Sequence, residues 1–228
     1  MNVLVTGAAG YIGSIVARDL QRHHTVRGVD MRPMPALEDH RVIDLNDYDQ
    51  IHAALEDIQA IAHLAWPMRP YEGCAPADGT ELGAGVRGLY HLLHAALARG
   101  IKRVVFQSTI NITAPSWDSW RVIEGETPRP GGAGYTLGKT LAEEVCRVFA
   151  QQHPLTIAII RFGGVFTLEA EGHEHAAPDQ HYIPSSCVER HPSGSATSPP
   201  GAAEASSAVM VLSLAARSID PTLARYAC

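Results

Sequence analysis

The fold of this 228-residue chain is decided by one stretch near its start, Thr6-Gly7-Ala8-Ala9-Gly10-Tyr11-Ile12-Gly13. Its three glycines recur at every third position. The apolar run Val3-Leu4-Val5 precedes it and has the pattern of a buried parallel strand. Apolar residues at helical spacing follow it, from Tyr11 to Leu20. The stretch is therefore a glycine-rich turn between a strand and a helix, which is the context of a phosphate-binding loop.

Each glycine of this loop has a separate expected role. Gly7 permits the tight turn, Gly10 lets a pyrophosphate approach the backbone, and Gly13 lets the helix pack close to the strand. The N-terminus of the helix then offers N–H groups and the positive end of its dipole to the phosphates. A tight turn without a ligand is the alternative. We favour a dinucleotide site, formed by Gly7, Gly10, Tyr11, Ile12 and Gly13.

Strands and helices alternate along most of the chain. Beyond the loop, the patterns predict strands over 25–30, 41–44, 60–65, 103–107 and 155–160, and helices over 48–58, 82–99 and 134–152. This alternation predicts an α/β fold, a Rossmann-type doubly wound parallel sheet with helices on both faces.

The C-terminal part has a different composition. Residues 185–208 are rich in Ser, Ala, Pro and Gly, which is typical of a linker or a disordered segment. Residues 209–216 fit a short helix or a short strand. We therefore separate a dinucleotide-binding Rossmann domain, residues 1–167, from an irregular, partly disordered C-terminal region, residues 168–228.

Composition and charge exclude several classes of function. The chain is 46% hydrophobic and has a net charge of −6, so a globular core is feasible and a nucleic-acid partner is not expected. No apolar run is long enough for a membrane helix, and the N-terminus lacks the features of a signal peptide. The four cysteines are widely spaced, which favours reduced thiols and a cytoplasmic location. His173, His175 and His181 fit no usual ligand spacing, so we expect no metal.

Two acidic positions bear on the choice of cofactor. Asp30 ends the second predicted strand, where a carboxylate binds both hydroxyls of the adenosine ribose and repels a 2′-phosphate. This favours NAD over NADP, although Arg32 offers a site for the extra phosphate. Asp44 and Leu45 are placed to contact the adenine edge, with a helix N-terminal acid as the alternative reading of Asp44.

A tyrosine and a lysine four residues apart lie on one face of a predicted helix: Tyr135 and Lys139. Lowering the pKa of a tyrosine from 10 to ~7 takes about 4 kcal/mol of differential stabilisation. A nearby lysine, the positive nicotinamide ring and a low dielectric are the expected sources. Tyr135 would then remove a hydroxyl proton as hydride leaves the same carbon, and Lys139 would also hold the nicotinamide ribose. Thr109, after the fifth strand, is placed to orient the reacting oxygen, with Ser108 as its competitor.

Together these motifs resemble the extended short-chain dehydrogenase/reductase family, in its NAD-dependent epimerase/dehydratase branch. The resemblance covers residues 1–167. In the N-terminal half, TGAAGYIG (6–13) resembles the family's TGxxGxxG, and His63-Leu64-Ala65 resembles its HLAA. Further on, Phe106-Gln107-Ser108-Thr109 resembles the strand that ends in the catalytic Ser or Thr, Tyr135 and Lys139 match YxxxK, and Arg161-Phe162 matches the start of RxxN.

The resemblance implies roles for further residues. Leu64 and Ala65 would contact the cofactor, and Trp66 would form a wall of the substrate pocket unless it only packs within its loop. Thr109, Tyr135 and Lys139 would be the catalytic residues.

The chain departs from the family pattern in three respects. Gly85 stands where the family has Asn in NVxG, and Gly164 replaces an Asn that contacts substrate. The family's C-terminal lobe, which helps to form the substrate pocket, is expected to be incomplete here. We therefore regard residues 168–228 as a truncated or frame-shifted remnant.

These observations predict an NAD-dependent enzyme that acts on a sugar or nucleotide sugar by hydride transfer from a carbinol carbon, as an epimerase or dehydratase. The alternatives are an NAD-dependent sugar dehydrogenase of the uronate type, an NADP-linked carbonyl reductase, and a non-catalytic dinucleotide-binding regulatory domain. The long helices over 82–99 and 134–152 are expected to pair across a homodimer, as is common in the family.

Overall fold

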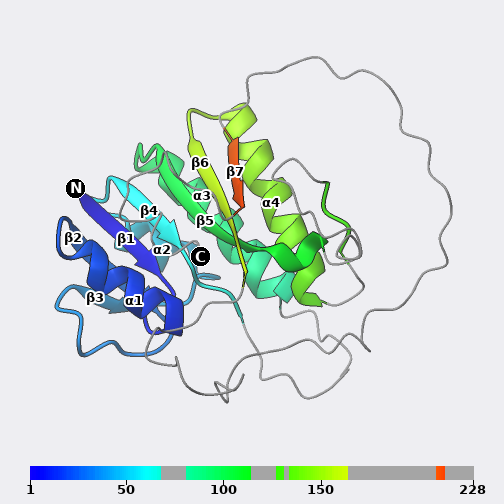
Figure 1. Ribbon diagram of the computed structural model, residues 1–228. Helices are drawn as coiled ribbons and strands as arrows, with labels where there is room; N and C mark the ends of the chain where they lie inside the picture. Colours follow the sequence, from blue (N-terminus) through cyan, green and yellow to red (C-terminus); the bar gives the residue numbers. More distant parts are fainter. Residues whose placement is uncertain (68–80, 114–126, 131–133, 164–208, 214–228) are drawn as a thin grey trace, which may run out of the picture.

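The computed structural model describes residues 1–67, 81–113, 127–130, 134–163 and 209–213. Seven strands form one parallel sheet in the spatial order β3-β2-β1-β4-β5-β6-β7 (Figure 1). The strands are β1 (Asn2–Thr6), β2 (Thr25–Asp30), β3 (His40–Val42), β4 (Ala60–His63), β5 (Arg103–Thr109), β6 (Thr156–Phe162) and β7 (Val209–Ser213). The first six follow the order of a Rossmann sheet, so the predicted fold class is confirmed.

Helices cover both faces of the sheet. They are α1 (Tyr11–Leu20), α2 (Tyr48–Ala54), the π-helix η1 (Glu81–Val86), α3 (Arg87–Ala98) and α4 (Gly134–Gln152). Alternate residues of β1 enter different cores: Val3 and Val5 pack with α1, and Leu4 packs with α2, α3 and α4. This alternation is the expected consequence of opposite side-chain directions along a strand. Within the described ranges, no helix is long and apolar enough to cross a membrane.

The observed elements differ from the predicted ones mainly at their ends. α2 stops at Ala54 instead of residue 58, and Asp57 has a positive φ of 61°, outside the helical region. β5 continues through Thr109, so Ser108 and Thr109 belong to the strand and do not follow it. The helix predicted over 82–99 begins as the π-helix η1, a distortion that often accompanies functional sites.

The C-terminal region contributes one strand to the sheet. β7 pairs in parallel with β6, which settles the open choice between helix and strand for this segment. The rest of residues 168–228 lies outside the described residues, so the division at residue 167 stays a prediction.

A buried ion pair joins α4 to β6. The guanidinium group of Arg161 donates two hydrogen bonds to the Glu143 carboxylate, at 2.9 Å and 2.8 Å. Both residues are almost fully buried, at 2% and 0% exposure. Such a pair fixes geometry more than it adds stability, because both charges lose their hydration. It therefore anchors the helix that carries Tyr135 and Lys139 to β6, between β5 and β7.

We expect Glu143→Gln to destabilise the protein by about 3 kcal/mol, because Arg161 then keeps a buried charge without its carboxylate. The measurement is urea unfolding at neutral pH. Glu144→Gln is the matched control, since Glu144 is the next residue of α4 and its side chain is 60% exposed. Equal losses in the two variants would contradict an anchoring role for Glu143.

Candidate functional site

The glycine loop lies where β1, α1 and the segment after β4 approach one another most closely. Gly7 has a φ of +70°, and a Cβ atom there would lie 2.8 Å from the backbone of Ala65. A Cβ atom on Gly13 would lie 2.0 Å from the Gly7 carbonyl oxygen. Gly10 caps α1 without a side chain, so no cap side chain occupies the N–H groups of the first turn. The loop therefore has the open helix N-terminus that a pyrophosphate group fits.

Thr6 organises the segment that follows β4, a role that was not predicted from the sequence. Its hydroxyl oxygen accepts hydrogen bonds from the N–H groups of Leu64 and Ala65, both at 3.1 Å. Both of its lone pairs are then used, so its own hydrogen is donated to His63 Nδ1, 2.7 Å away. This arrangement places the His63 proton on Nε2. Burial, and secondarily the charge of Lys139, lowers the pKa of His63 to about 3, so the ring is neutral.

Asp30 connects β2 to the glycine loop. Its carboxylate accepts hydrogen bonds from the backbone N–H groups of Ala9, at 3.1 Å, and Arg32, at 3.0 Å. The carboxylate is thus at the end of β2 where the sequence predicted it. The Arg32 side chain also reaches Asp30, at 3.4 Å, but it is 66% exposed. The contact is therefore a weak surface pair.

Asp44 and Leu45 have structural contacts of their own. The Asp44 carboxylate accepts hydrogen bonds from the backbone and side chain of Asn46, at 2.8 Å and 2.9 Å. Leu45 packs against the core and against Gly88. Asp44 thus orders the turn before α2, and the helix cap is Asp47. Contacts of Asp44 and Leu45 with an adenine ring stay a prediction.

Thr109 and Tyr135 meet at the carboxyl end of β5. The Thr109 hydroxyl accepts a hydrogen bond from the Asn111 N–H at 3.2 Å and is hydrogen-bonded to the Tyr135 side chain. Ser108 points to the other face of the sheet, because successive strand residues alternate. Its hydroxyl is buried and has no hydrogen-bond partner within the described segments. The geometry brings Thr109, and not Ser108, to the tyrosine.

Lys139, one turn further along α4 than Tyr135, is fully buried. Its ammonium group donates a hydrogen bond to the Gln107 carbonyl oxygen at 2.7 Å. Burial lowers its pKa to about 7, against the opposing effect of Cys146 and Glu143. Gln107 was not predicted from the sequence, since a backbone acceptor leaves no trace in residue type.

The expected lowering of the Tyr135 pKa, which includes the positive charge of the nicotinamide ring, stays a prediction; in the protein alone the pKa lies above its ordinary value. Burial raises this pKa, and the hydrogen bond from Thr109 opposes the rise. The lysine is turned toward Gln107, so spacing alone did not predict its contacts.

Trp66 lies between Lys139 and η1. Its indole ring centroid is 4.1 Å from Lys139 Nζ, within the range of a cation–π contact. The same ring packs against Gly85, where a Cβ atom would lie 2.9 Å from it. Among the residues predicted to contact substrate, Trp66 lies beside Lys139, Ser108 is the strand neighbour of Thr109, and Gly164 lies outside the described residues.

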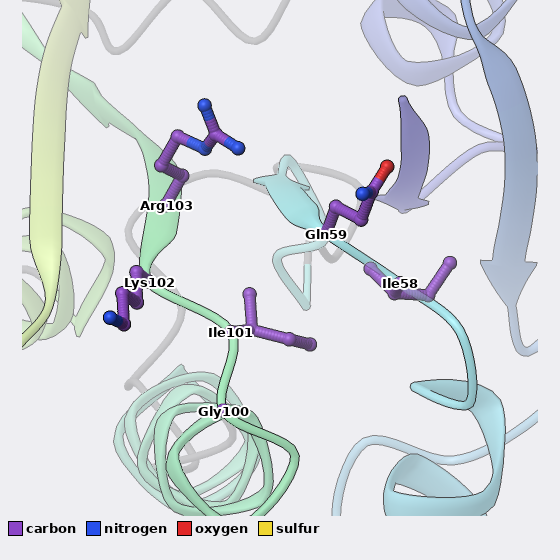
Figure 2. A pocket seen from close by; sticks show the side chains of 6 residues that line it. All are labelled: Ile58, Gln59, Gly100, Ile101, Lys102 and Arg103. Atoms are coloured by element: carbon purple, nitrogen blue, oxygen red, sulfur yellow. The ribbon is translucent and has the colours of Figure 1, made fainter.

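A separate hollow lies at the opposite ends of the strands (Figure 2). It is lined by residues that lead into β4 and β5: Ile58, Gln59, Gly100, Ile101, Lys102 and Arg103. Ligands of open parallel sheets bind beyond the carboxyl ends of the strands, at the point where the strand order reverses. That point lies between β1 and β4, beside the glycine loop, so this hollow is not part of the candidate site.

Residues 3–189 match the NAD dependent epimerase/dehydratase family. The chain belongs to this family. The predicted resemblance is thereby confirmed.

Three proteins illustrate the similarity. The uronate dehydrogenase of Pseudomonas syringae pv. tomato is 31% identical over 72% of this chain and 59% of its own length. A short-chain dehydrogenase/reductase superfamily protein from Agrobacterium tumefaciens, solved with bound NAD, is 31% identical with a TM-score of 0.64, over 71% of this chain and 49% of its own. The UDP-glucose 4-epimerase of Thermus thermophilus, solved with NAD, is 27% identical with a TM-score of 0.59, over 73% of this chain and 56% of its own. The chain thus spans about half to three fifths of the length of these relatives.

We expect Gly13→Ala to abolish dinucleotide binding and to lower the melting temperature by several degrees, because the new methyl group would collide with the Gly7 carbonyl. Gly83→Ala is the control, since a Cβ atom there meets nothing within 4 Å. The measurements are thermal unfolding and titration with NADH. Normal NADH binding by Gly13→Ala would contradict the assignment of the loop.

Proposed function

We propose that this chain binds NAD beyond the carboxyl ends of its parallel strands and oxidises the carbinol carbon of a sugar-type substrate. The glycine loop would hold the pyrophosphate at the N-terminus of α1, and Asp30 would bind the adenosine ribose. Leu64 and Ala65, held by Thr6, would line the path toward Lys139. NAD, when bound, supplies the positively charged ring that accepts hydride.

The observation that carries the proposal is the hydrogen bond between Thr109 and Tyr135, a tyrosine one turn of α4 before the buried Lys139. Tyr135 would take the substrate hydroxyl proton as the C–H bond breaks, and Thr109 would orient the same hydroxyl. Tyr135 must act as a phenolate, which burial alone disfavours. A positive charge next to the phenol, from Lys139 or from the ring of NAD, would stabilise that phenolate.

The substrate class follows from the relatives and stays a proposal. We favour a uronate or a related sugar acid as the first substrate to test, because the uronate dehydrogenase is 31% identical to this chain. A nucleotide-sugar epimerase or dehydratase is the second candidate, favoured by the similarity to the UDP-glucose 4-epimerase. Accumulation of NADH distinguishes them, since an epimerase returns the hydride to its substrate. The expected homodimer and cytoplasmic location stay predictions from sequence.

We expect Tyr135→Phe to lower kcat at least a hundredfold, because the proton acceptor is lost, while NADH affinity changes little. For a uronate dehydrogenase, the measurement is NADH formation with uronates. For the epimerase alternative, it is detection of the altered sugar by chromatography. Tyr90→Phe, on the exposed side of α3, is the control. Binding of NADH with no turnover on either class of sugar would favour the non-catalytic dinucleotide-binding alternative.

We expect Asp30→Asn to weaken NADH binding about tenfold, because a charged hydrogen bond to the ribose is lost. NADPH binding should improve, since the repulsion of its 2′-phosphate is removed. Nicotinamide fluorescence titration measures both affinities, with the exposed Asp49→Asn as control. An unchanged ratio of the two affinities would refute the role of Asp30 in cofactor choice.

A further inference from the structure

Trp66 and Gly85 both depart from the family pattern, one with a larger side chain and one with a smaller. The stretch His63-Leu64-Ala65 matches HLAA up to its fourth position, where this chain has Trp66 in place of alanine. Gly85 stands where NVxG has asparagine. One position has thus gained an indole ring and the other has lost its entire side chain.

The structure shows that these two changes meet in space. A Cβ atom on Gly85 would lie 2.9 Å, 3.0 Å and 3.2 Å from Cη2, Cζ2 and Cε2 of Trp66. Real Cβ contacts are not this close, so a side chain at position 85 would displace the indole. Gly85 is buried in η1, which packs against α4, the helix of Lys139.

The displaced indole would uncover Lys139. The ammonium group lies between the ring faces of Trp66, at 4.1 Å, and Phe106, at 4.9 Å, and the Gln107 carbonyl oxygen. The ionisable groups that act on it are His63 from β4 and, within α4, Glu143 and Cys146. None of these three donates or accepts a hydrogen bond with the ammonium group within the described parts of the chain. The aromatic rings and one carbonyl are therefore its direct contacts.

We propose that Trp66 and Gly85 form a compensating pair, in which the indole fills the space of the side chain absent at position 85 and holds the Lys139 ammonium group against the Gln107 carbonyl. Trp66 is then a positioning residue for the lysine. The inference rests on the proposed function only for its consequence, namely that Trp66 controls how far Lys139 reaches toward Tyr135 and the nicotinamide ribose. The contact itself does not depend on turnover.

Lysine side-chain NMR tests the contact directly, because the chain contains only two lysines, Lys102 and Lys139. With ¹⁵N-lysine labelling, exposed Lys102 serves as the internal reference. Trp66→Phe keeps a ring face, so we expect the titration midpoint of Lys139 to stay within about half a pH unit of the unsubstituted protein. Trp66→Ala opens a polar space that water enters, so the midpoint should rise by about one pH unit or more.

Gly85→Asn gives an independent reading in a chain that keeps its tryptophan. We expect the Lys139 midpoint to rise as in Trp66→Ala, because the asparagine pushes the indole away. An unchanged midpoint in both Trp66→Ala and Gly85→Asn would overturn the positioning role.

Thermal unfolding tests the compensation. Trp66→Ala leaves a cavity and Gly85→Asn creates a clash, so each variant alone should melt below the unsubstituted protein. The double variant Trp66→Ala/Gly85→Asn should melt above both single variants, because the asparagine occupies the space that the indole left. A double variant that melts below both would overturn the pairing. Neither readout needs a substrate, so a failure here is distinct from a failure to find turnover.

Discussion

The backbone at Gly13 lies so close to the Gly7 carbonyl that a Cβ atom would come within 2.0 Å of it, and the rest of the site depends on this approach. It sets the angle between β1 and α1, so that the first turn of α1 lies beyond the carboxyl ends of the strands. The same loop meets the segment after β4 at Ala65, where Gly7 has no room for a side chain. Thr6, one residue earlier, binds that segment through two backbone N–H groups. Strand, loop and the neighbouring segment therefore form a single rigid corner.

A second constraint lies on the other side of β4, where the protein buries ionisable groups at a cost in hydration. Lys139 and Glu143 have no exposed surface, and Arg161 is 2% exposed. The lowered pKa of Lys139 means that the folded state disfavours its charge, so burial of this residue costs stability below the ordinary pKa of a lysine. That penalty increases as the pH falls from about 10.5 to about 7 and is constant below. Groups of this kind are kept where function requires them, and here Lys139 and Glu143 lie on α4 and Arg161 lies on β6.

The sequence predicted the architecture well because its signals are local and strong. Apolar runs identified the central strands, and the bounds of α1, α4 and β2 agree with the structure. The predictions were wrong where the end of a helix depends on tertiary contacts. The helix predicted over 82–99 begins as the π-helix η1, and α2 ends before its predicted C-terminus. Residue types and spacing identified Thr109, Tyr135 and Lys139 as candidate catalytic residues. They did not predict the partner of Lys139, because Gln107 acts through its backbone and Trp66 through its ring face. The sequence did not predict the contact between Trp66 and Gly85, because the two residues are far apart along the chain and meet only in the folded protein.

A crystal structure of the full 228-residue chain grown with NAD would show where the dinucleotide binds. We expect it beyond the carboxyl ends of the strands, with its pyrophosphate at the first turn of α1, its adenosine ribose on Asp30 and its nicotinamide ribose near Lys139. A pyrophosphate bound away from Gly10 and Gly13, or a nicotinamide ring directed away from Tyr135, would rule out the proposed site.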